Sequence, residues 1–201
     1  MRLSSEKALE LLEEARKKVN EDRFIKHSIC VGNTAAIIAK ALNLDEDYAK
    51  TLGYIHDIGK MFQEHGGVFP HAMNGYNYIK DLGYDEDYAG ICIKHSFLNN
   101  DIDCISNDRD ETDKSNSNYA FVKNYIKEEY SIYEKIINLC DLMCTTKVLT
   151  VDKRMMDLLI RHGIFKKTYY HIEETLKLKK YFDELLGYNL YDLLPEVKDN
   201  L

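Results

Sequence analysis

The segment LNLDEDYAKTLGYIHDIGK, residues 42–60, shows the helical pattern of this chain most clearly and also carries its strongest functional signal. Asp45 is a good helix N-cap residue, and apolar residues follow it at helical spacing. The pattern predicts a helix that carries His56 and Asp57 at its end, with Gly59 stopping it. Adjacent helical side chains point about 100° apart, so this pair can reach one ion only near a helix end or from two sides of it.

Helical periodicity recurs from one end of the chain to the other. Proline occurs only at positions 70 and 195, and no β-rich run with period-two alternation stands out. The predicted fold class is therefore all-α. Helices are expected at about residues 5–19, 23–42, 45–57, 71–82, 85–95, 119–129, 132–145, 151–162 and 168–186, with a short turn near Leu190.

Length, charge and cysteine content narrow the class of protein. The 201 residues fit one compact domain, and the formal net charge of -7 argues against a long nucleic acid as the main partner. The five cysteines are an odd number without a CxxC pair, which disfavours a disulfide framework or zinc ribbon. No signal peptide, anchor or spanning segment is visible, so we expect a cytoplasmic protein without a membrane partner.

One segment breaks the helical rhythm. Residues 98–118 are rich in Asn, Asp and Ser and show little periodicity, which predicts a long polar loop or a partly disordered insert. If this insert folds over a site, its Arg109 offers a contact for a substrate. A plain solvated loop is the simpler interpretation.

Two further residues strengthen the signal of the His56-Asp57 pair. His27 lies in an otherwise amphipathic helix, and Asp141 lies inside the apolar run IINLCDLMC, residues 136–144. An unpaired carboxylate among apolar neighbours would be costly to desolvate, so a partner such as a metal ion is expected. The alternative is an N-cap residue or a partly exposed acid.

The order His27, His56-Asp57, Asp141 resembles that of the HD superfamily of metal-dependent phosphohydrolases, over about residues 23–147. The resemblance is carried by HSICVGNTAAIIAKAL, by LGYIHDIGK and by the 29-residue spacing between the two histidines. It implies a helical bundle in which the four residues converge on one metal ion.

Two more histidines point to a two-metal subclass. His71 opens HAMNGYNYIKDLG and His95 lies in CIKHSF, at positions similar to the additional histidines of bacterial diadenosine tetraphosphate hydrolases of the HD type and of HD-GYP phosphodiesterases. The alternatives are a helix N-terminal residue and a core histidine, and His65 is a substitute for His71. The GYP element itself is absent, which disfavours cyclic-di-GMP as substrate.

The resemblance implies how these residues share two divalent ions. Asp57 would bridge the ions, three residues would complete the shell of one, and two histidines would bind the other. Nitrogen and carboxylate ligands suit iron, manganese, zinc or cobalt, and we favour iron or manganese. The expected metal ligands are His27, His56, Asp57, His71, His95 and Asp141.

The expected reaction is hydrolysis of a phosphoester or phosphoanhydride by a metal-bound hydroxide, with a nucleotide or another small phosphorylated metabolite as substrate. Besides Asp57, Lys60 is a candidate catalytic and substrate-binding residue, because it matches a lysine of the family motif and could clamp a phosphate. Its alternative is a solvated lysine at a helix end. Arg109 is a further candidate for substrate binding.

Two other functions stay open. A few HD proteins with the same two-metal ligand set use mixed-valent iron to activate oxygen, so a di-iron oxygenase is one alternative. A non-catalytic sensor that binds a nucleotide is the other. We expect residues 1–150 to form the metal-binding helical domain, residues 151–201 to form a helical extension packed on it, and a homodimer to be compatible with the sequence.

Overall fold

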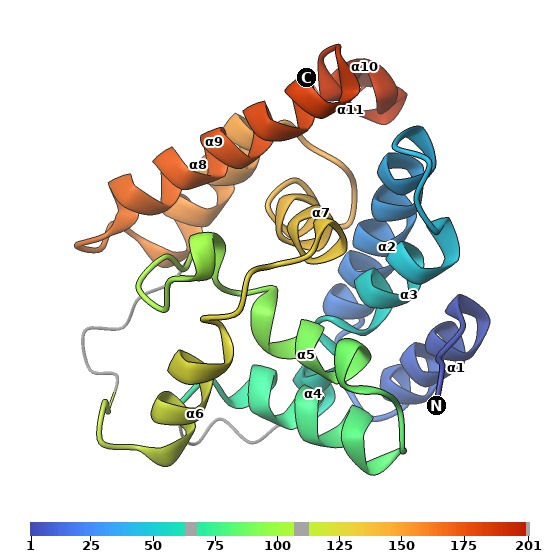
Figure 1. Cartoon of the computed structure of the whole chain (residues 1–201), viewed down its shortest axis with the longest axis vertical. Coiled ribbons are helices and arrows are strands. Elements are labelled where there is room, and N and C mark those ends of the chain that lie inside the picture. Colours follow the sequence, from blue (N-terminus) through green and yellow to red (C-terminus); the bar gives the residue numbers. More distant parts are fainter. Residues whose placement is uncertain (63–67, 107–112, 200–201) are drawn as a thin grey trace.

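The computed structural model describes residues 1–62, 68–106 and 113–199 (Figure 1). Within these ranges the chain forms helices and loops without a β-strand, which confirms the all-α fold class. The α-helices are α1 (Ser5–Arg16), α2 (Arg23–Ala41), α3 (Glu46–Ile55), α4 (Pro70–Asp81), α5 (Glu86–Lys94), α6 (Ser117–Tyr125), α7 (Ile132–Asp141), α8 (Val151–His162), α9 (Thr168–Leu186), α10 (Leu190–Leu193) and α11 (Pro195–Asp199). Two short 3-10 helices, η1 (Ile58–Met61) and η2 (Leu98–Asn100), complete the set for these ranges.

Local capping explains where several helices begin. The Ser4 side chain accepts a hydrogen bond at the start of α1, and Thr150 does the same at the start of α8. Ser131 and Glu134 form a reciprocal capping box at the start of α7. The helix α7 ends at Asp141, however, and not at residue 145 as predicted. The chain then turns, and the carbonyl oxygen of Thr145 comes within 3.2 Å of His27 Nδ1 in α2.

Gly59 does not stop the helix before it, so that prediction is wrong. The helix α3 ends at Ile55, His56 is its C-cap residue, and Gly59 lies inside η1. A Cβ atom on Gly59 would lie 1.9 Å from the carbonyl oxygen of His71 in α4. Glycine is needed here because η1 and α4 touch backbone to backbone.

A second pair of glycines sets the spacing of α2 and α3. A Cβ atom on Gly53 would lie 2.4 Å from the Cα atom of Gly32. The two backbones therefore meet directly, five residues after His27 and three before His56. This crossing brings the two histidines toward each other.

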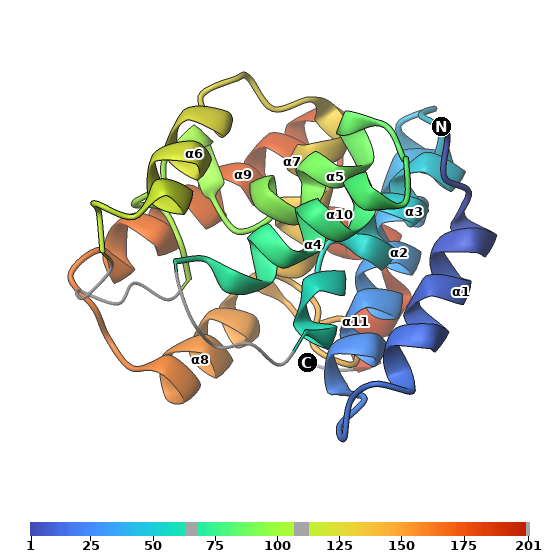
Figure 2. The same cartoon turned by 90° about the horizontal axis from the view of Figure 1, so that it is seen from below.

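The C-terminal helices pack on the rest of the chain (Figures 1 and 2). One hydrophobic cluster joins buried residues of α1, α2, α3 and α7 to Leu158, Phe182 and Leu190 of the last fifty residues. The helix α9 also lies against α7 and η2. A domain boundary at residue 150 stays a prediction.

The beginning of the predicted insert is packed. Leu98, Ile102 and Cys104 are buried, and Leu98 N–H donates to the Cys104 carbonyl. Asp101 accepts a hydrogen bond of 3.0 Å from Tyr170 of α9. A plain solvated loop is therefore the wrong interpretation for residues 98–106, because this segment is held between the core and α9.

The helices of the described ranges include none that is both long enough and apolar enough to cross a membrane.

Candidate metal centre

Six residues predicted as metal ligands lie together where α2, α4, α5 and α7 meet the turn after α3. They form two groups whose nitrogen and carboxylate atoms lie within 4.8 Å of one another inside each group. The first group is His27, His56 and Asp141, and the second is Asp57, His71 and His95.

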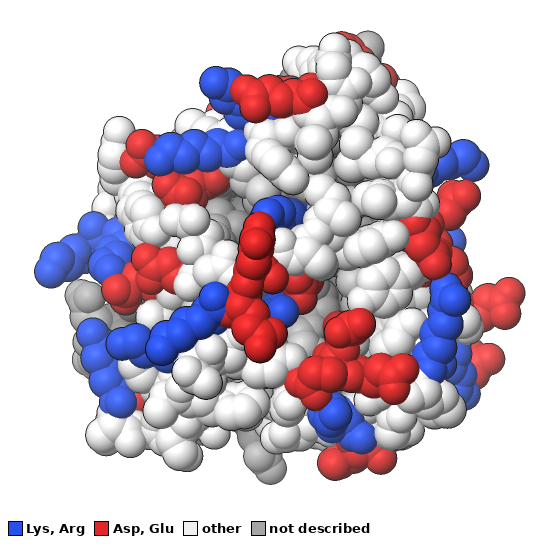
Figure 3. All heavy atoms as spheres, in the orientation of Figure 1, with Lys and Arg blue, Asp and Glu red and all other residues white. Residues whose placement is uncertain are grey.

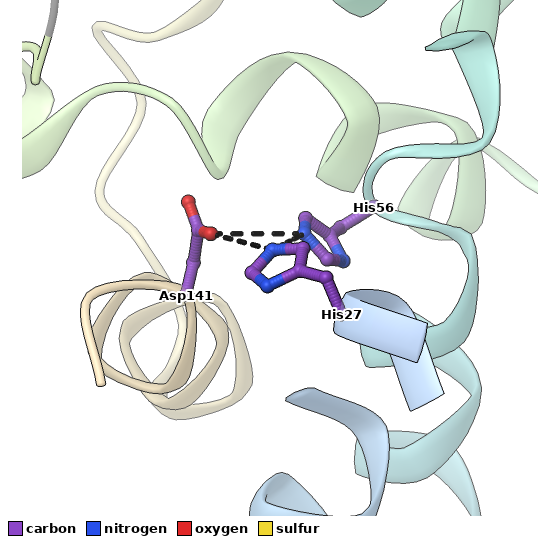
Figure 4. Close-up of side chains that lie close together, drawn as sticks. All are labelled: His27, His56 and Asp141. Atoms are coloured by element: carbon purple, nitrogen blue, oxygen red, sulfur yellow. Dashed lines mark hydrogen bonds and ion pairs between the residues drawn. The ribbon is translucent and has the colours of Figure 1, made fainter. Parts of the chain in front are cut away.

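The first group brings together three separate elements (Figure 4). His27 Nε2 lies 2.9 Å from Asp141 Oδ1 and 3.2 Å from His56 Nε2. His56 Nε2 lies 3.9 Å from the same Asp141 oxygen. The three candidate ligand atoms thus face one point between α2, α7 and the end of α3.

Backbone carbonyls fix the orientation of three imidazoles. The Nδ1 atom of His27 lies 3.2 Å from the Thr145 carbonyl oxygen, that of His56 lies 2.7 Å from Gly53 O, and that of His95 lies 3.1 Å from Ile91 O. A neutral imidazole in such a contact carries its proton on Nδ1 and has a lone pair on Nε2. Metal-binding histidines are commonly oriented in this way.

This arrangement places the Nε2 atoms of His27 and His56 opposite each other. With both Nδ1 atoms protonated, the His27 and His56 Nε2 atoms are two acceptors separated by 3.2 Å. Two nitrogen ligands at about 2.1 Å from one ion lie roughly 3.0 to 3.4 Å apart for octahedral or tetrahedral angles. The first group therefore fits a divalent metal ion.

The second group is centred on a buried carboxylate. Asp57 is 1% exposed, and its Oδ1 atom has no hydrogen-bond partner among the described residues. His95 Nε2 lies 3.4 Å from this oxygen. The other carboxylate oxygen, Oδ2, lies 3.5 Å from His56 Nε2 and forms an ion pair with the Lys60 ammonium group. A buried anion with an unsatisfied oxygen is costly, so this group also fits a cation.

The charge states of these residues suit metal binding. Burial lowers the pKa of His56 to about 4 and that of His71 to about 3. Both imidazoles are therefore neutral at pH 7, the form that binds a metal ion. Burial alone would raise the pKa of Asp57, but Lys60 and His56 outweigh it and hold that pKa well below its usual value.

A pocket of about 520 Å³ opens onto both groups. Lys60 lines it beside Asp57, and its role as a phosphate clamp stays a prediction. The Ser96 hydroxyl lies near Nε2 of both His71 and His95. His65 and Arg109 lie outside the described residues.

The sequence interpretation missed the opposite wall of this pocket. Arg154, Leu158, Arg161 and His162 of α8 line it, together with Arg23 of α2. The spacing of the α8 residues, four, three and one apart, is a helical-face signal that could have been noticed. His162 belongs to neither of the two groups.

The other C-terminal histidine, His171, is a buried residue outside the two groups, and its protonation should lower the stability of the fold in acid. Burial lowers its pKa to about 4, although Asp141 acts in the opposite direction. The unfolded chain, with an imidazole pKa near 6.5, then binds the proton more readily, so stability falls as the pH drops below about 6.5. Between pH 7.5 and 5, this effect amounts to about 2 kcal/mol.

We therefore expect His171→Gln to remove about 2 kcal/mol of the pH dependence of unfolding, measured by urea titration in the presence of a chelator. Equal slopes for wild type and His171→Gln would contradict the assignment.

Comparisons with known proteins agree with this geometry. The family model of the HD domain matches residues 24–145, which include both groups. Ribonuclease Y of Oleidesulfovibrio alaskensis is 38% identical over 71 residues, which cover 35% of this chain and 14% of that protein. The chain thus matches only about a seventh of the length of this relative. No solved structure matches.

The family match covers more than half of the chain. Proteins with this domain bind divalent metals and are generally metal-dependent hydrolases, in accord with the two groups of histidines and aspartates. The residue order, the helical fold and the matched region agree, and the chain belongs to the HD domain family.

Proposed function

We propose that this protein is a phosphohydrolase that uses two divalent metal ions to cleave a phosphoester or phosphoanhydride in a small phosphorylated molecule, with a nucleotide as the expected substrate. One observation carries the proposal: the Nε2 atoms of His27 and His56 lie 3.2 Å apart, next to the Asp141 carboxylate. A hydrogen-bonded core histidine would not need this arrangement, whereas a metal ligand set would.

In this proposal, each group of residues holds one ion. His27, His56 and Asp141 would bind the first, and His71 and His95 would bind the second. Asp57 would bridge the two, because its Oδ2 atom faces His56 while its Oδ1 atom faces His95. Iron and manganese suit this set of nitrogen and carboxylate ligands.

Bound ions of this kind supply Lewis-acid polarisation of a phosphoryl group and a water molecule deprotonated near neutral pH. The chain supplies the positioning. Lys60 is partly exposed in the pocket and contacts Asp57, so its ammonium group lies where it can donate to a phosphoryl oxygen. The Ser96 hydroxyl lies 3.0 Å from His95 Nε2 and 3.4 Å from His71 Nε2, so it borders the space that the second ion would take.

The pocket favours a small substrate over a polymer. Its wall includes apolar side chains of Phe24, Leu142 and Leu158, which can pack against a base or another apolar moiety. On the face shown in Figure 3, acidic and basic side chains are interspersed, and no continuous basic stripe follows the surface. Together with the net charge of -7, this argues against long nucleic acid as the substrate.

The test is an anaerobic activity screen of the protein reconstituted with Mn²⁺. The substrates are nucleoside mono-, di- and triphosphates, p-nitrophenyl phosphate and a short RNA. We expect phosphate release from at least one of the small compounds, lost on addition of a chelator.

Asp141→Asn is the control against contaminating phosphatases and should be inactive. Strict dependence on oxygen would instead indicate an oxygenase. Normal metal binding without turnover of any compound would indicate a sensor, and cleavage confined to the RNA would overturn the small-substrate assignment.

A further inference from the structure

The C-terminal helix α8 presents one face to the same pocket that the candidate metal ligands line. Arg154, Leu158, Arg161 and His162 lie on this face and line the pocket. The helix lies beyond residues 24–145, which the HD family model matches. This wall is therefore a feature of the chain that the family assignment does not explain.

Arg154 is an unusual residue for a pocket wall. Its side chain is 9% exposed, and its Nη1 atom donates to Asp157 Oδ2 at 2.5 Å. Its buried Nε atom has no hydrogen-bond partner among the described residues. A buried guanidinium with an unmatched donor is costly, so a further acceptor is expected.

Arg161, about two helical turns further along α8, adds a second positive charge to this part of the pocket. Arg161 Nη2 donates to the same Asp157 Oδ2 atom at 2.7 Å. One carboxylate is thus shared by two guanidinium groups, which leaves a net positive charge on this wall. Arg23 also lines the pocket and has no ion pair with any residue of the described ranges.

Two sides of the pocket lining carry cationic groups. Lys60 lies on the side of the candidate metal ligands, where the proposed ions would offset the Asp57 and Asp141 carboxylates, and the arginines of α8 form the other side. Both sides border the same volume of about 520 Å³, which is large enough for a molecule that bridges them. A guanidinium group matches a phosphate by paired hydrogen bonds, so the arginine side fits a second phosphoryl group.

We propose that Arg154 and Arg161 bind a phosphoryl group of the substrate other than the one that is cleaved, so that the preferred substrates carry at least two phosphoryl groups. The inference rests on the proposed function and narrows it from phosphorylated molecules in general to phosphoanhydrides and other oligophosphates. In this assignment Arg154 and Arg161 are specificity-determining residues.

Equilibrium binding tests the arginine subsite without requiring turnover. Isothermal titration compares inorganic pyrophosphate with inorganic phosphate on the Mn²⁺-loaded protein, with Mn²⁺ in excess. Wild-type protein should bind pyrophosphate more tightly than phosphate. Arg154→Gln should weaken pyrophosphate binding by about tenfold or more and change phosphate binding by less than about threefold.

Lys153→Gln is the matched control, because it removes one positive charge from the adjacent position of α8 without altering a pocket-lining side chain. It should leave the affinity of both anions within about twofold of wild type. Equal losses in the Lys153 and Arg154 variants, or equal losses for the two anions in Arg154→Gln, would overturn the subsite.

A second variant keeps the test decisive if Arg154→Gln does not fold. Asp157→Asn removes the carboxylate that competes for both arginines, so pyrophosphate should bind more tightly than in wild type. Weaker binding in folded Asp157→Asn would count against the proposal.

The two proposals can fail separately. If no compound is hydrolysed but Arg154→Gln weakens pyrophosphate binding as described, the arginine subsite is supported and the phosphohydrolase assignment is wrong. If mono- and oligophosphates are hydrolysed and lose the same factor in Arg154→Gln, only the subsite falls.

Discussion

Replacing Asp57 with asparagine is expected to abolish hydrolysis and to reduce the metal content of the purified protein. The Asp57 carboxylate lies between the two groups, with one oxygen toward His56 and the other toward His95. A neutral amide has the same shape, but it cannot supply two anionic oxygens to two cations. We expect a loss of about 1,000-fold or more in kcat/KM and less than one ion per chain by elemental analysis.

Single-ligand variants provide the comparison. His27→Gln affects only the first group, and His71→Gln affects only the second. Each should lower the metal content by about one ion while leaving the other ion bound, if the two groups hold separate ions as proposed. Full metal content in Asp57→Asn, with retained activity, would remove Asp57 from the bridging role.

The second large effect is expected at Gly59, through packing alone. A methyl group in Gly59→Ala would lie 1.9 Å from the His71 carbonyl oxygen and 2.5 Å from the Gly75 nitrogen. Both are backbone atoms of α4, so neither can move aside without moving the helix. We expect a loss of about 3 kcal/mol or more in the free energy of unfolding, measured by urea denaturation.

A matched glycine separates this contact from an effect of backbone conformation. Gly187, at the end of α9, has a φ of 76° and would have open space around a Cβ atom. Gly187→Ala should therefore cost only about 1 kcal/mol, from backbone strain. A Gly59→Ala protein as stable as Gly187→Ala would show that η1 and α4 do not meet as described.

The sequence predicted the helices well wherever the pattern was local. The bounds of α8 and α9 agree with the predicted residues 151–162 and 168–186, because capping residues and apolar spacing act within a few turns. It also predicted which residues converge near α2 and α7, through the family resemblance. Their role as metal ligands stays a prediction.

Failures arose where distant segments meet. The apolar run after Leu139 predicts a helix to residue 145, yet α7 ends at Asp141 and the turn beyond it brings the Thr145 carbonyl to His27. Gly59 has the sequence signature of a helix stop, but its function is set by α4, which follows eleven residues later. Neither contact leaves a trace in a short stretch of sequence. The same holds for the wall formed by α8.

The position of α8 outside the matched domain has a consequence for how this chain can diverge. Every candidate metal ligand precedes Thr145, whereas Arg154 and Arg161 follow it. Substitutions in α8 can alter the pocket wall without changing any candidate metal ligand. With the roles proposed above, natural selection would act on substrate choice and on bond cleavage through separate stretches of one gene.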